Sequence, residues 1–123
     1  MTTRRGLAWL AVAIVSGCAM DPYRFDAPRL GAGVELDPYG SWQECVALDR
    51  GERFDFYFVS VVPVAFNIHY RDANAVIMPI TRDNATRDSG VFTADHKDIY
   101  CVAWKAGVEP SVLEYQLRPL PAR

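Results

Sequence analysis

The sequence predicts an all-β protein, an antiparallel, jelly-roll-like β-sandwich of about eight strands. From residue 33 onward, apolar and polar residues alternate with a period of two. Clusters of Gly, Pro, Asn and Asp interrupt this alternation about every eight to twelve residues, as turns between short strands do. No stretch shows the 3.6-residue period of an amphipathic helix. Two packed sheets suit such strands, because they limit the number of exposed edges.

The clearest strand spans residues 53–62. Phe54, Phe56 and Phe58 alternate with polar residues, which predicts one buried and one exposed face. Pro63 lacks a backbone donor and predicts a bulge, an edge or a corner where the strand changes sheets. A further strand is expected at residues 64–71.

The remaining strands are shorter and separated by turns. They are expected at residues 33–37, 42–48, 75–80, 90–94, 98–105 and 111–118. The polar stretch 81–89 has no apolar period and is predicted to be a loop. The proline-containing tail 119–123 is not expected to continue a strand.

The N-terminal stretch carries the features of a secretory signal. Arg4 and Arg5 precede an uncharged apolar run at residues 7–15. The last residue of this run begins the tetrad Val15-Ser16-Gly17-Cys18. A transmembrane helix needs about 20 apolar residues, so this run is too short to span a bilayer. The tetrad resembles the lipobox of bacterial lipoproteins. The resemblance implies that Cys18 is acylated, becomes the first residue of the mature chain and anchors it to the membrane. Secretion without a lipid is the alternative.

In lipoproteins of Gram-negative bacteria, an aspartate directly after the cysteine favours the inner membrane. That position is Ala19 here, so the resemblance implies the periplasmic face of the outer membrane. The predicted organisation is therefore a signal peptide at 1–17, the lipidated cysteine and an extended tether at 18–32, a β-sandwich at 33–118 and a tail at 119–123. Tyr23 and Phe25 are the tether residues that could pack on the domain edge.

Charge and cysteine content restrict the function. Without the signal peptide the chain has 11 basic and 15 acidic residues, a net charge of about −4 with no basic cluster. This argues against nucleic acid and against binding a membrane by charge. Apart from Cys18 the chain has two cysteines, Cys45 and Cys101, an even number that allows one disulfide in an oxidising compartment. Two free buried thiols are the alternative. Neither lies at redox or zinc-site spacing, so we expect no cofactor and no metal.

Several segments resemble the GOLD domain, a β-sandwich of luminal cargo receptors. They are residues 44–48 with 51–56, residues 65–70, and residues 90–94 with 99–104. The resemblance implies a fold used for binding and a bridge between Cys45 and Cys101. The coiled coil and membrane helix of cargo receptors have no counterpart after Arg118, so the receptor role does not carry over.

No catalytic motif is present, which predicts a protein that is not an enzyme. His69 is expected to be a solvated strand residue and His96 a turn residue. A set of loop residues would bind calcium or, with His96, form a hydrolase site only if the fold gathered them at one end. These residues are Asp83, Asn84, Asp88, Asp95 and Asp98.

The exposed aromatic residues are the candidate ligand contacts. Trp42 and Tyr57, with Trp104, could form a platform for a sugar or a protein. The alternative is that Trp104 and the phenylalanines fill the core around the cysteine pair. The sequence thus predicts a non-enzymatic, lipid-anchored envelope protein that binds another envelope protein. A carbohydrate- or peptidoglycan-binding module and a periplasmic hydrolase are the alternatives.

Overall fold

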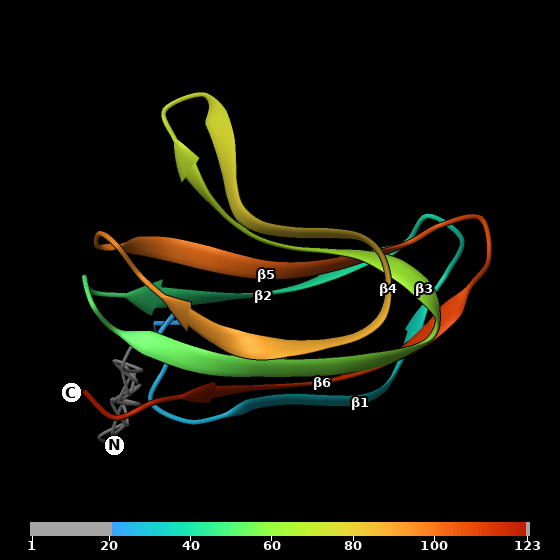
Figure 1. The fold of residues 1–123 in the computed structure, drawn as a ribbon, viewed down its shortest axis with the longest axis horizontal. Helices are drawn as coiled ribbons and strands as arrows, with labels where there is room; N and C mark the ends of the chain where they lie inside the picture. The colour runs from blue at the N-terminus through green and yellow to red at the C-terminus, as the bar shows by residue number, and fades with distance from the viewer. Residues whose placement is uncertain (1–20, 123) are drawn as a thin grey trace, which may run out of the picture.

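The computed structural model describes residues 21–122, and these residues form six antiparallel strands (Figure 1). The strands are β1 (Arg29–Leu36), β2 (Ser41–Leu48), β3 (Arg53–Asp72), β4 (Ala75–Thr93), β5 (Asp98–Ala106) and β6 (Ser111–Pro119). They follow the order β1-β6-β3-β5-β2, and β4 pairs with β3 along its length. No helix among residues 21–122 is long and apolar enough to cross a membrane.

Strand β3 belongs to both layers of the fold. Its residues 54–60 pair with β6, and its residues 64–69 pair with β5. One layer therefore holds β1, β6 and the first half of β3, and the other holds β2, β5 and the second half. The two layers pack as an antiparallel β-sandwich, which confirms the predicted fold class.

Of the bulge, edge or corner predicted at Pro63, the structure has a corner, where β3 changes its partner from β6 to β5. The register with β4 breaks between Val59 and Val64. Here the Val62 N–H donates to Ser111 Oγ at 3.0 Å, and Ser60 Oγ donates to the Val62 carbonyl at 2.6 Å. Side-chain hydroxyls thus satisfy the backbone groups of Val62 where the ladder is interrupted.

The prediction of eight strands is wrong in two places. Residues 53–62 and 64–71 form one strand, because Pro63 bends β3 without ending it. Residues 81–89 are not a loop but the middle of β4. This part of β4 pairs with β3 on one side only, and its side chains are mostly exposed. Backbone pairing holds it extended, so the sequence needs no apolar alternation there.

Phenylalanine and tryptophan side chains fill the space between the layers. Phe54, Phe56 and Phe58 are buried, as their alternation predicts. The Phe58 ring lies 4.6 Å from that of Phe66 and 6.0 Å from that of Trp104, centroid to centroid. Trp104 is only 1% exposed, which confirms that it is a core residue.

The two cysteines form a disulfide, as predicted. Cys45 on β2 lies directly opposite Cys101 on β5 in the ladder, with the Cα atoms 4.0 Å apart. The bond therefore joins neighbouring strands of one layer. It closes a sequence separation of 56 residues, which includes all of β3 and β4.

The predicted tether is mostly part of the folded domain. Cys18 and the signal peptide lie outside the described residues, but β1 begins at Arg29, ahead of the strand expected at residue 33. The Ala47 N–H donates to the Tyr23 carbonyl at 2.7 Å, and the Phe25 ring lies 5.8 Å from that of Phe54. The segment before β1 thus packs against β2 and the core, and the folded domain starts earlier than predicted.

Candidate binding surfaces

Tyr57 lies at the centre of an exposed sheet face. It points away from the core, between the buried Phe56 and Phe58, and 44% of it is exposed. The register places it opposite Gln116 on β6 and Ser89 on β4, and Gln116 is opposite Leu30 on β1. These four residues form a row across four strands, which we call the Tyr57 row.

Two shallow hollows flank Tyr57. One, of about 420 Å³, is lined by Tyr57 together with Leu30, Gly31, Ala32, Glu114, Tyr115 and Gln116. The other, of about 370 Å³, is lined by Tyr57 with Arg87, Asp88 and Ser89. The phenol ring thus separates two surface hollows that contain amide, hydroxyl and charged groups.

The charges on this face are balanced. Arg118 donates to both carboxylate oxygens of Asp55, at 3.2 and 3.3 Å. Val59, the next residue of β3 on the same face as Tyr57, lies between Glu114 on β6 and Arg87 on β4. The face therefore has polar groups without a strong charge of one sign.

Trp42 lies on a different surface from Tyr57. It is opposite Trp104 in the β2–β5 ladder, so it belongs to the inner side of that layer. Its Nε1 donates to the Tyr115 hydroxyl, which in turn donates to Glu44 Oε1, both at 3.0 Å. Trp42 is 42% exposed but lies on the inner side of its own layer, so the predicted shared platform with Tyr57 and Trp104 does not form.

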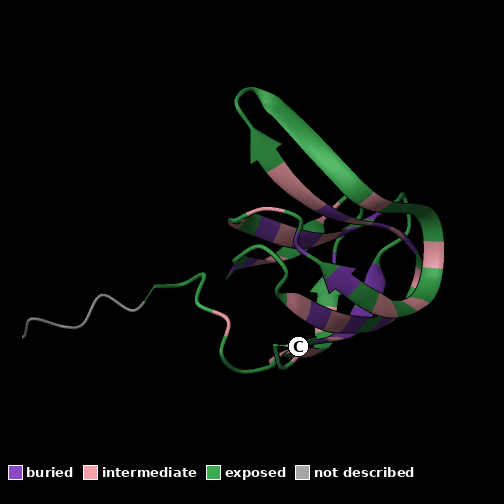
Figure 2. Cartoon of the chain, turned by 60° about the vertical axis from the view of Figure 1, so that its left-hand side comes forward, coloured by how far each residue is buried: buried purple, intermediate pink, exposed green. Residues whose placement is uncertain are grey.

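The end of the β3–β4 hairpin projects from the sandwich. We call residues 70–80 the arm; β3 pairs with β5 only up to His69, so the arm lies beyond that pairing (Figures 1 and 2). Residues 71–79 are all exposed. They include three consecutive large apolar side chains, Val76 (46% exposed), Ile77 (37%) and Met78 (49%). Successive strand residues point to opposite faces, so both faces of the arm carry apolar side chains.

His96 is held in the turn between β4 and β5. Its Nδ1 lies 2.6 Å from Asp95 Oδ1, and its Nε2 lies 2.9 Å from Asp98 Oδ2. Its ring packs edge-on against Tyr70 at the base of the arm, with the centroids 4.6 Å apart. His96 is thus a turn residue, as predicted.

The loop acids do not gather into one site. Asp95 and Asp98 meet at His96, whereas Asp83 and Asp88 lie on β4, where Asp88 pairs with Arg82 at 3.1 Å. Among residues 21–122, no three His, Cys, Asp or Glu side chains are placed to hold a metal ion. The five residues therefore lie in two separate places, and only Asp95 and Asp98 contact His96.

The two histidines are expected to titrate on opposite sides of the ordinary pKa of 6.5. Hydrogen bonds to Asp95 and then to Asp98 raise the pKa of His96. Burial, and then the positive charge of Arg71, lower the pKa of His69. NMR titration should therefore give a midpoint above 6.5 for His96 and below 6.5 for His69. Replacing Asp98 with asparagine should lower the midpoint of His96 alone, and equal midpoints in the wild type would contradict the contacts of the two rings.

The sign of the stability effect follows from the raised pKa of His96. Its hydrogen bonds to the two carboxylates stabilise the fold fully below pH 6.5, as long as the carboxylates stay ionised. This contribution is lost as the pH rises through the folded-state pKa. Because the turn is exposed to solvent, we expect the effect on stability to be small.

No family model matches the chain, so the GOLD resemblance stays a prediction. No curated protein matches it either. A solved structure titled "CBM4 structure and function" shares 15% identity with a TM-score of 0.41 and covers 76% of this chain and 78% of that one. A likeness of this size does not establish a shared ligand.

Proposed function

We propose that this protein is a non-enzymatic binding module, anchored to the cell envelope by a lipid on Cys18, that binds another envelope protein through the arm. The observation that carries the proposal is the exposure of Val76, Ile77 and Met78 on a projecting hairpin. The N-terminal stretch that ends at Cys18 supports the anchor.

The arm has the properties of a protein-docking element. A Val, Ile or Met side chain contributes roughly 1.5–3 kcal/mol when it is fully buried, and exposed side chains leave most of this unrealised. Three large apolar side chains exposed on one projecting hairpin favour an interaction site, since both faces of the arm can be covered by a partner. In addition, within residues 21–122 β4 pairs with β3 only, which leaves its other edge available to a partner strand.

The Tyr57 row favours a second candidate, carbohydrate binding. A flat aromatic ring offers an apolar surface to the C–H face of a sugar. The side chains of Gln116, Ser89 and Glu114 can donate to or accept from sugar hydroxyls. Because the charges on this face are balanced, a neutral glycan suits it better than an anionic one.

One pair of variants separates the two candidates. Crosslinking in intact cells should capture a protein with the wild type and with Tyr57→Ala, whereas Ile77→Lys should lower the yield about tenfold or more, which corresponds to about 1.4 kcal/mol or more. Val108→Lys is the matched control, since Val108 is 70% exposed and lies outside the arm. Loss of capture with Tyr57→Ala but not with Ile77→Lys would overturn the arm as the binding site.

Pull-down with an insoluble uncharged polysaccharide, alongside isolated peptidoglycan with its peptide carboxylates, tests the second candidate with the same proteins. Carbohydrate binding predicts that Tyr57→Ala loses retention while Ile77→Lys keeps it. Palmitate labelling tests the anchor separately: the wild type should be labelled and Cys18→Ala should not. Equal labelling of the two would refute lipidation at Cys18.

A further inference from the structure

The folded part of the chain begins very close to the proposed lipid. Residues 21–25 are already fixed, because the Arg24 N–H donates to the Asp21 carbonyl at 3.1 Å and Tyr23 is bonded to Ala47. Arg29 ties down the same segment, since its Nη2 donates to the carbonyls of Pro22 and Arg24 at 2.9 and 3.1 Å. This segment is therefore not a free tether.

Covalent geometry limits how far Asp21 can be from the lipidated residue. Cys18 and Asp21 are three residues apart, and an extended chain spans at most about 3.6 Å per residue. Asp21 must therefore lie within about 11 Å of Cys18. If acyl chains hold Cys18 at the bilayer, Asp21 stays near the headgroups.

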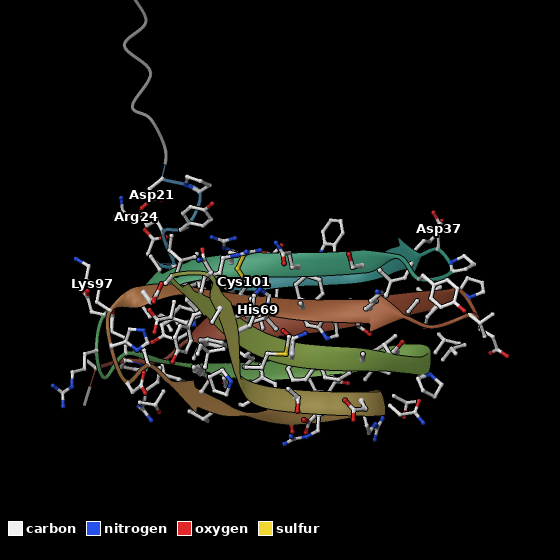
Figure 3. All side chains as sticks on the ribbon, turned by 90° about the horizontal axis from the view of Figure 1, so that it is seen from above. Asp21, Arg24, Asp37, His69, Lys97 and Cys101 are labelled. Carbon is white, nitrogen blue, oxygen red and sulfur yellow. A yellow bond between two sulfur atoms is a disulfide. The ribbon has the colours of Figure 1, made fainter. Side chains whose placement is uncertain are left out.

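Asp21 occupies one corner of the sandwich. Tyr23 contacts Ala47 near the end of β2, and β2 is at the edge of its layer that is farthest from β4. The same end carries the β2–β3 and β4–β5 turns, where Lys97 Nζ lies 3.9 Å from Asp49 Oδ1. Figure 3 shows Asp21, Arg24 and Lys97 at this end and Asp37 at the other.

The diagonally opposite corner is the bend of β4 at residues 85–87, opposite the register break of β3 between Val59 and Val64. From β2, strand β4 lies three strands away across β5 and β3, which is about 14 Å. The bend also lies at the far end of the strands, about 27 Å away along the nine-residue β5. Both distances exceed the reach of the segment between Cys18 and Asp21.

We infer that the corner formed by residues 21–25 and the Asp49 and Lys97 turns faces the bilayer, and that the β4 bend points away from it. The inference rests on the proposed lipid anchor. Beyond the anchor itself, the inference assigns the lipid headgroup layer as the surface that this corner contacts. In residues 21–25 and the two turns, four acidic side chains (Asp21, Asp49, Glu52 and Asp95) outnumber three basic ones (Arg24, Arg50 and Lys97). The short lipid tether, rather than charge attraction, therefore sets the orientation.

Energy transfer to the membrane surface tests the orientation. Lys97→Cys and Thr86→Cys are labelled with the same donor, since both residues are exposed and lie at opposite corners. The acylated proteins are placed on vesicles of phosphatidylethanolamine and phosphatidylglycerol with an acceptor on a fraction of the headgroups. Because Thr86 lies on the order of 15–30 Å farther out, transfer from Lys97 should be roughly twofold or more above that from Thr86.

Two variants show whether the docked segment is the cause. A flexible Gly-Ser insert before Asp21 should make the two efficiencies converge. Phe25→Ser with Arg29→Ser, which removes contacts of the docked segment, should also reduce the difference. Equal transfer in the unmodified chain, or a difference that survives the insert, would overturn the inference. Mass spectrometry of Cys18 reports separately on the anchor, and an unmodified thiol there would remove the basis of both proposals.

Discussion

Replacing Phe58 with alanine is expected to lower the free energy of unfolding by about 3–5 kcal/mol. Phe58 is fully buried on the first half of β3 and contacts Phe66 and Trp104. Trp104, on β5, belongs to the opposite layer. The truncation would therefore open a cavity at the contact between the two layers. Urea unfolding followed by tryptophan fluorescence measures the change.

Tyr57→Ala is the matched control for this experiment. Tyr57 is the neighbouring residue on the same strand but points to the solvent side. Surface substitutions usually change stability by about 0.5 kcal/mol or less, so the control should unfold near the wild-type midpoint. Similar losses for the two variants would contradict the assignment of the inner and outer faces of β3.

Removing the disulfide is expected to cost about 4 kcal/mol. The bond closes a separation of 56 residues, and in the chain-entropy model its loss mainly frees the unfolded chain. The double variant Cys45→Ala, Cys101→Ala avoids an unpaired thiol, and both side chains are only half-buried. Its unfolding midpoint should fall well below that of the oxidised wild type.

Reduction of the wild type provides the control for the double variant. Reduced protein should unfold near the midpoint of the variant, because both lack the same constraint. Thiol titration should find two additional thiols in the reduced sample, from Cys45 and Cys101. A loss below about 1 kcal/mol in both samples would show that the bond contributes little to the stability of this domain.

The candidate surfaces could be predicted only in part. The alternation in β3 already implies that Tyr57 is exposed, because its neighbours Phe56 and Phe58 are apolar. Gln116 and Ser89 come from strands far away in sequence, so only the register could place them beside Tyr57. The apolar run at residues 76–78 was visible as a strand, but nothing local showed that it lies beyond the second layer.

The surroundings of Trp42 could not be predicted from the sequence either. Its sequence neighbourhood does not distinguish an exposed platform from a cover over the core. Two contacts place its side chain on the inner side of the layer. Trp42 lies opposite Trp104 in the ladder, and its Nε1 donates to the hydroxyl of Tyr115, 73 residues away. Contacts of this kind depend on how separate strands meet, which a period of two does not encode.

Local chemistry was enough to predict the all-β class and the inward phenylalanines of β3. It also limited Pro63 to a bulge, an edge or a corner, and the cysteines Cys45 and Cys101 to a bridge or two free thiols. Each follows from a property of a single segment or from counting cysteines: side-chain alternation, a missing backbone donor, an even number of thiols. The long β4, the docked residues 21–25 and the separation of Trp42 from Tyr57 arise only on folding. They depend on pairing between segments distant in sequence, and the free energy of that pairing outweighs the weak local preferences of polar and proline-containing stretches.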